Sequence, residues 1–69
     1  MLKADKATVD WDHEKKHWRV RVEVGKEVIK RTLPEVPQNA TDDVLRTSAV
    51  EDAKDEGYTL DPASVAIAH

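Results

Sequence analysis

Residues 17–24 read HWRVRVEV, and this stretch decides the fold of the 69-residue chain. Trp18 and three valines take every second position, and two arginines and a glutamate lie between them. A period of two is typical of a β-strand that buries one face and exposes the other. We therefore expect a strand here whose apolar face packs on a core and whose charged face meets solvent.

The next two residues, Gly25 and Lys26, predict a tight hairpin turn. Glycine at the first central position suits a type II′ turn, because that position needs a positive φ. This two-residue loop leads into a further strand over residues 27–33. The expected register pairs Val22 with Ile29, Val20 with Arg31 and Trp18 with Leu33.

Another strand is expected upstream, because residues 8–12 (TVDWD) alternate in the same way. A four-residue loop at 13–16 gives a register that pairs Trp11 with Trp18, Val9 with Val20 and Ala7 with Val22. On the other face it sets Asp10 opposite Arg19, an opposite-charge pair that favours the same alignment. The result is a three-stranded antiparallel meander with residues 17–24 in the middle. Its two tryptophans form a buried cross-strand pair, with an exposed stacking platform for unpaired bases as the alternative.

A connector separates the meander from one helix. Residues 33–39 (LPEVPQN) contain two prolines, which cannot continue a central strand. In one interpretation the helix begins after Asn39 or Thr41, with two aspartates in its first turn. Its apolar stripe is then Leu45, Ala49, Val50 and Ala53.

In the other interpretation the helix begins at Ser48, which forms a capping box with Glu51 and leaves residues 44–47 extended. Both interpretations place a helix over residues 49–56. Both also end it at Gly57, because glycine readily adopts the left-handed conformation just beyond a helix.

Residues 64–68 predict a short last strand, most simply added to the edge of the meander. The predicted fold is a single α+β domain over residues 1–69. It consists of a three- to four-stranded antiparallel sheet with one helix packed on one face (β-β-β-α-β). The chain has no cysteine, which excludes disulfides and thiolate metal sites. No apolar run approaches the ~20 residues of a membrane span, and we expect a cytoplasmic protein without membrane association.

Charge is divided between the two halves of the chain. Residues 1–33 carry nine basic and six acidic side chains, a net of +3. Residues 34–69 carry two basic and eight acidic side chains, a net of −6, and the two halves sum to the formal −3 of the chain. Such asymmetry indicates binding through an electrostatically marked face.

Two charged faces are candidates for that binding. The basic candidates are Arg19, Arg21 and Lys30 on the sheet face away from the core, with Lys15 and Lys16 in the preceding loop. They would contact phosphates or an acidic protein surface, or form a solvated face balanced by interleaved acids. The acidic candidates on the helix are Glu51, Asp52, Asp55 and Glu56. They form either a docking face for a basic partner or an ordinary solvated helix surface.

The sequence does not predict catalysis or a cofactor. Ser48 and Ser64 lie outside a Gly-x-Ser-x-Gly turn, and two glycines do not make a phosphate-binding loop. His13 and His17 flank a hairpin loop without a third ligand fixed by the pattern, so we expect no metal site. The chain is predicted to be a non-enzyme.

The order strand, strand, strand, helix, strand, with KKHW at residues 15–18 and EGY at 56–58, resembles the small RNA-polymerase inhibitors of T7-like phages. The resemblance spans about residues 15–68. It implies a non-catalytic inhibitor that binds a host protein through charged surface residues. The last strand, VAIA at 65–68, lacks the arginines of a polymerase-contacting edge, so no site residue is carried over.

Residues 18–33 (WRVRVEVGKEVIKRTL) also resemble the arm-type DNA-binding domain of tyrosine recombinases. In that family a three-stranded sheet presses its basic face into the major groove of DNA. The resemblance implies DNA contacts by Arg19, Arg21, Lys30 and Thr32.

We therefore expect a small binding protein, a phage- or mobile-element-type regulator that acts on a host protein through a charged face. Binding of DNA through the basic sheet face is the alternative function. The expected partner is a protein, with nucleic acid as the alternative. A monomer or a weak homodimer is expected, because the edge of a short sheet can pair with its copy.

Overall fold

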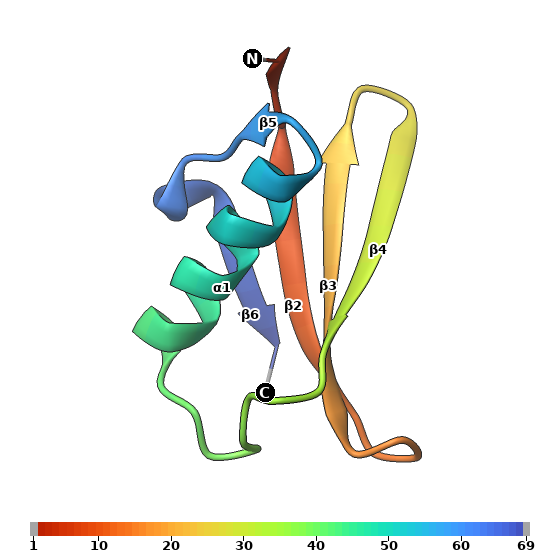
Figure 1. Ribbon diagram of the computed structural model, residues 1–69, viewed down its shortest axis with the longest axis vertical. Coiled ribbons are helices and arrows are strands. Elements are labelled where there is room, and N and C mark those ends of the chain that lie inside the picture. The colour runs from red at the N-terminus through yellow and green to blue at the C-terminus, as the bar shows by residue number, and fades with distance from the viewer. Residues whose placement is uncertain (1, 69) are drawn as a thin grey trace.

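The computed structural model describes residues 2–68, which form a four-stranded sheet with one helix across one face (Figure 1). The elements, in chain order, are β1 (Leu2–Lys3), β2 (Lys6–Asp12), β3 (His17–Val24), β4 (Glu27–Leu33), α1 (Asp42–Asp55), β5 (Tyr58–Thr59), a short 3-10 helix (Pro62–Ser64) and β6 (Val65–Ala68). The predicted α+β class is confirmed.

Both predicted hairpins are present in the expected register. Strands β2 and β3 pair Trp11 with Trp18, Val9 with Val20 and Ala7 with Val22. Strands β3 and β4 pair Val22 with Ile29, Val20 with Arg31 and Trp18 with Leu33. Gly25 has the positive φ, +60°, that the first central position of the turn requires.

The direction of the last strand corrects the prediction. The strand order is β4-β3-β2-β6, and β6 pairs with β2 in parallel, so the sheet is mixed and not wholly antiparallel. The reason is the length of α1, whose 14 residues span about 21 Å at the usual helical rise. A seven-residue strand such as β4 spans about 23 Å. The helix therefore returns the chain to the end of the sheet where β2 and β4 begin, and β6 runs in their direction.

A second, two-stranded sheet joins the start of the chain to the exit of the helix. Strands β1 and β5 pair in parallel, with Leu2 opposite Tyr58 and Lys3 opposite Thr59. The backbone N–H of Ala4 donates to the carbonyl of Thr59 at 2.8 Å. Strands of two residues have no visible period, so the sequence pattern does not predict this pair.

Helix α1 follows the earlier of the two predicted starts. Thr41 is the N-cap, and its Oγ1 accepts a hydrogen bond from the N–H of Val44 at 3.4 Å. The start at Ser48 is wrong, because Leu45 must already be helical to share a fully buried stripe with Ala49 and Ala53. Gly57, with φ +89°, ends the helix as predicted.

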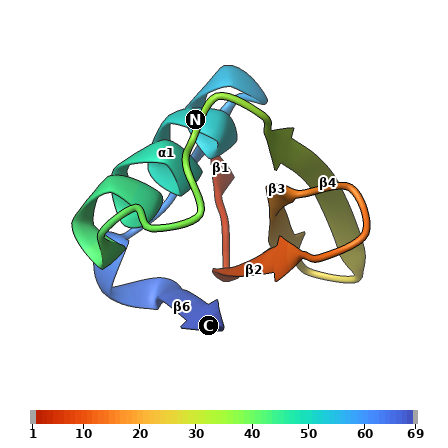
Figure 2. The same cartoon turned by 90° about the horizontal axis from the view of Figure 1, so that it is seen from below.

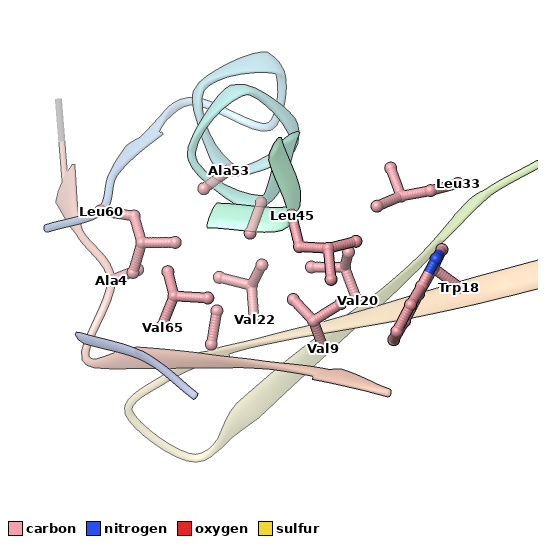
Figure 3. Packing of buried hydrophobic residues seen from close by; sticks show 12 residues of the cluster. Ala4, Val9, Trp18, Val20, Val22, Leu33, Leu45, Ala53, Leu60 and Val65 are labelled. Carbon is pink, nitrogen blue, oxygen red and sulfur yellow. The ribbon is translucent and has the colours of Figure 1, made fainter. Parts of the chain in front are cut away.

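The core lies between α1 and the inner face of the sheet (Figure 3). Leu45 from the helix meets Val9, Val20 and Val22 from the strands, and each of these side chains is at most 1% exposed. The predicted tryptophan pair is also present, with ring centroids 5.3 Å apart in an edge-to-face arrangement. The prediction that both rings are buried is only partly correct, because Trp11 is half-buried at the side of the core. Trp18 is buried, and its Nε1–H donates to the carbonyl of Pro37 at 2.8 Å, which holds the connector against the sheet.

The two helix starts lead to opposite expectations for two alanine substitutions. Thr41→Ala removes the N-cap acceptor and should lower the free energy of unfolding by about 1 kcal/mol. Ser48→Ala lies in the middle of α1 and should change it by less than about 0.5 kcal/mol. Urea denaturation of both variants measures this difference, and a larger loss in Ser48→Ala would contradict the observed start.

Candidate functional site

The sheet has an outer face on the side away from α1 (Figure 2). Three of the five predicted basic residues, Arg19, Arg21 and Lys30, lie on this face. Its charged side chains are those that alternate with the core positions along β2, β3 and β4. The cations are Lys6, Arg19, Arg21 and Lys30, and the carboxylates are Asp10, Asp12 and Glu23. Because cations and carboxylates are mixed on this face, the ion pairs determine which of the cations remain unpaired.

Arg21 and Lys30 are cross-strand partners in the middle of the outer face. Both side chains are exposed, and neither takes part in an ion pair with any residue in the described part of the chain. Thr8, on the other side of Arg21, offers no charge. Like charges directly opposite one another destabilise a sheet, and the centre of this face holds two cations that no carboxylate among residues 2–68 pairs with.

Arg19, in contrast, is bound by carboxylates of the neighbouring strand. Its guanidinium donates to both oxygens of Asp10, at 2.6 and 3.2 Å, and lies 3.8 Å from Asp12. The hydrogen bond with Asp10 raises the pKa of Arg19 above its ordinary value. The predicted Asp10–Arg19 pair is therefore confirmed, and most of the charge of Arg19 is balanced inside the sheet.

Asp12 also organises the loop between β2 and β3. Its Oδ1 accepts hydrogen bonds from the backbone N–H groups of Glu14 and Lys15, at 3.0 and 3.1 Å. The bond from Lys15 is the main cause that lowers the pKa of Asp12, and the N–H of Glu14 and the charge of Arg19 act in the same direction. The loop closes with Lys16 at a positive φ of 56°.

A shallow hollow of about 450 Å³ lies among these residues. Its charged and polar lining comprises Lys15, His17, Arg19, Arg21, Lys30, Arg31, Asp10, Asp12 and Thr32. Four of the five predicted basic residues therefore surround one depression, while Lys16 is exposed in the loop and does not line it. The Nδ1 atom of His17 is buried and has no hydrogen-bond partner among residues 2–68.

The predicted acidic face is divided by Arg31. The guanidinium of Arg31 bonds to Glu56 at 2.6 Å and lies 3.9 Å from Asp52. Burial raises the pKa of Asp52, and the nearby Arg31 opposes that rise. Glu51 and Asp55 are exposed, so only these two of the four predicted acids are outside this cluster.

Sequence reasoning did not assign a role to His17 or Arg31. The signal for Arg31 was its register opposite Val20, which places a charged side chain on the helix side of β4. Such a position requires a counter-charge from the helix, and Asp52 and Glu56, four residues apart, lie on one helix face. The signal for His17 was its position as the first residue of β3, directly before the buried Trp18, because alternation then places His17 on the outer face of the sheet.

Between residues 2 and 68, no three side chains of histidine or acidic residues are arranged to hold a metal ion. His13 is exposed in the loop, whereas His17 is half-buried at the start of β3. No helix formed by these residues is both long and apolar enough to cross a bilayer.

Comparison with known proteins returned no match: no protein-family model fits the chain, and no curated protein or solved structure is significantly similar to it.

The lowered pKa of Asp12 predicts a pH-dependent contribution to stability. A carboxyl whose pKa is depressed by folding stabilises the native state above its unfolded-state pKa of about 3.9. That stability is lost as the pH falls through the lower, folded-state pKa. Asp12→Asn should therefore be less stable than the natural protein at pH 7, and the difference should shrink as the pH falls below about 4.

Urea denaturation across this pH range measures the effect. Asparagine keeps an oxygen that can accept the two loop N–H bonds, so the substitution removes mainly the charge. Glu14→Gln is the matched control. It also removes one negative charge from this loop, but the Glu14 side chain makes no ion pair with residues 2–68. An equal loss in both variants, or a gap that persists at low pH, would contradict the assignment to Asp12.

Proposed function

We propose that the chain is a non-enzymatic protein-binding module, a regulator of the phage or mobile-element type that acts on a host protein through the outer face of its sheet. The observation that carries the proposal is the Arg21–Lys30 pair, two exposed like charges that face each other without a carboxylate partner among residues 2–68. A sheet with no binding role would be more stable with an acid or a neutral residue at either position.

The chemistry of the site favours an acidic partner. A carboxylate seated between Arg21 and Lys30 would replace their mutual repulsion with two attractive contacts, and the arginine can bind it through two parallel hydrogen bonds. The hollow beside the pair leaves room for such a group.

DNA binding through the same face is the second candidate. The observation that favours it is the three-stranded antiparallel unit β2-β3-β4 with cations on its outer face. However, Asp10, Asp12 and Glu23 lie on this face too, and Asp10 and Asp12 already bind Arg19. Phosphate binding depends on the number of free cations, so we rank a protein partner first.

Arg21→Glu separates stability from binding. Glutamate opposite Lys30 replaces a like-charge pair with an opposite-charge pair, so we expect unfolding to cost up to about 1 kcal/mol more. We also expect binding of the partner to weaken at least about tenfold, because an acid now repels it. Lys54→Glu, which makes the same charge change in α1, should leave the partner bound.

The measurement is capture from lysate with each tagged variant, followed by quantification of any stoichiometric protein. A partner retained equally by Arg21→Glu and the natural protein would refute the proposed binding face. A duplex retarded at low salt, and released by Arg21→Glu, would instead establish the DNA function, because non-specific DNA binding is strongest at low salt.

A further inference from the structure

Strand β4 lies at one edge of the four-stranded sheet (Figure 1). It is seven residues long, and no strand in the described part of the chain pairs with its free edge, the edge that faces away from β3. An unpaired strand of this length offers a row of N–H and C=O groups to another extended chain.

The register shows which backbone groups of β4 are available. Backbone groups of an antiparallel strand point alternately to its two neighbours. The carbonyl of Glu23 accepts from Asp5 on the β2 side, so Val22 and Val24 bond toward β4. Their partners Ile29 and Glu27 bond back toward β3. The backbone groups that point away from the sheet are therefore those of Val28, Lys30 and Thr32.

The helix side of this edge is also open to a further strand. Helix α1 packs on β2, β3, β5 and β6, with its main contacts away from β4. Ile29 is only half-buried. Arg31, which lies opposite Val20 on the helix side of β4, is bound by Glu56 and Asp52 of α1. An incoming strand would thus meet an apolar surface beside Ile29 and a charge already bound.

The charged side chains on the outer face of the sheet, next to this edge, favour an incoming strand of opposite charge. Lys30 is the central residue of β4, and Arg21 is its neighbour on β3. A second copy of β4 paired about its centre would set Lys30 opposite Lys30, which is destabilising. A strand whose carboxylates lie on the outer face of the sheet would instead contact the two unpaired cations, Lys30 and Arg21. The β6 edge has no such charges, since its outward residues are Ala66 and Ala68.

We propose that an acidic segment of the partner binds as an added fifth strand along β4, with carboxylates facing Lys30 and Arg21 and apolar residues on the helix side. This inference rests on the proposed function and specifies its mode of binding. Backbone hydrogen bonds to Val28, Lys30 and Thr32 provide the alignment, and the two cations provide the selectivity for acidic sequences.

Amide hydrogen exchange on the full chain tests the proposal directly. The probe is a synthetic seven-residue peptide of alternating glutamate and valine, matched in length to β4. At saturating peptide, exchange of the Val28, Lys30 and Thr32 amides should slow at least about tenfold. The amides of Ile29 and Arg31, which already bond to β3, should change little.

Two matched controls separate the edge from the face. A peptide of the same composition with its glutamates in one block should bind at least about tenfold more weakly, because it cannot present acids on one side only. Val28→Pro removes an outward N–H and no bond to β3, so it should weaken binding by a similar factor. Val28→Thr keeps that N–H and should bind within about twofold of the natural chain.

The remaining outcomes each decide a different point. Binding that is lost in Arg21→Glu, but leaves exchange at Val28, Lys30 and Thr32 unchanged, would overturn the edge inference and leave the proposed function standing. No binding of either acidic peptide would count against both. Protection of the same amides that rises with protein concentration in the absence of peptide would show self-pairing of β4 and overturn the inference.

Discussion

The register of β3 against its two neighbours is the constraint on which the rest of the structure depends. Side chains alternate along a strand, so a slip of one residue would expose the apolar set and bury the charged set. In the observed alignment Trp18, Val20 and Val22 are at most 2% exposed, and Leu45 of the helix packs on this surface. The same alignment places Arg21 on the outer face beside Lys30. Core and candidate binding face therefore follow from one pairing.

This pairing could be predicted because β2, β3 and β4 each carry several alternating residues and are joined by loops of fixed length. Two features of the fold lacked such a signal. The two-residue strands β1 and β5 are too short to show a period. The direction of β6 is not encoded in its own residues, because Val65 and Ile67 alternate equally well in parallel and antiparallel pairing. It depends on the length of α1, and that length depends on the helix start that the sequence left open.

The site was predictable to a similar extent. The alternation in β3 identifies Arg19 and Arg21 as outward, but it does not distinguish them. The distinction comes from β2, which places Asp10 opposite Arg19 and Thr8 opposite Arg21. One arginine is consequently bound within the sheet, while the other is free. The remaining ion pairs depend on how far long side chains extend in the folded protein. The bond from Arg31 to Glu56 joins residues 25 positions apart in the chain, so no local sequence pattern indicates this partner.

Arg31 also changes the meaning of the charge division between the two halves of the chain. It belongs to the basic half, yet it forms ion pairs with Asp52 and Glu56 of the acidic half and so links β4 to α1. What remains unpaired is then more clearly separated. Exposed acids such as Glu51 and Asp55 lie on the helix, and the unpaired cations Arg21 and Lys30 lie on the opposite side of the sheet. A domain charged in this way turns its outer sheet face toward negative potential, because summed charges orient molecules as they approach each other. The ion pairs of Arg19 and Arg31 therefore balance charges that would weaken this separation. The unpaired Arg21 and Lys30 remain on the face that an acidic partner would contact.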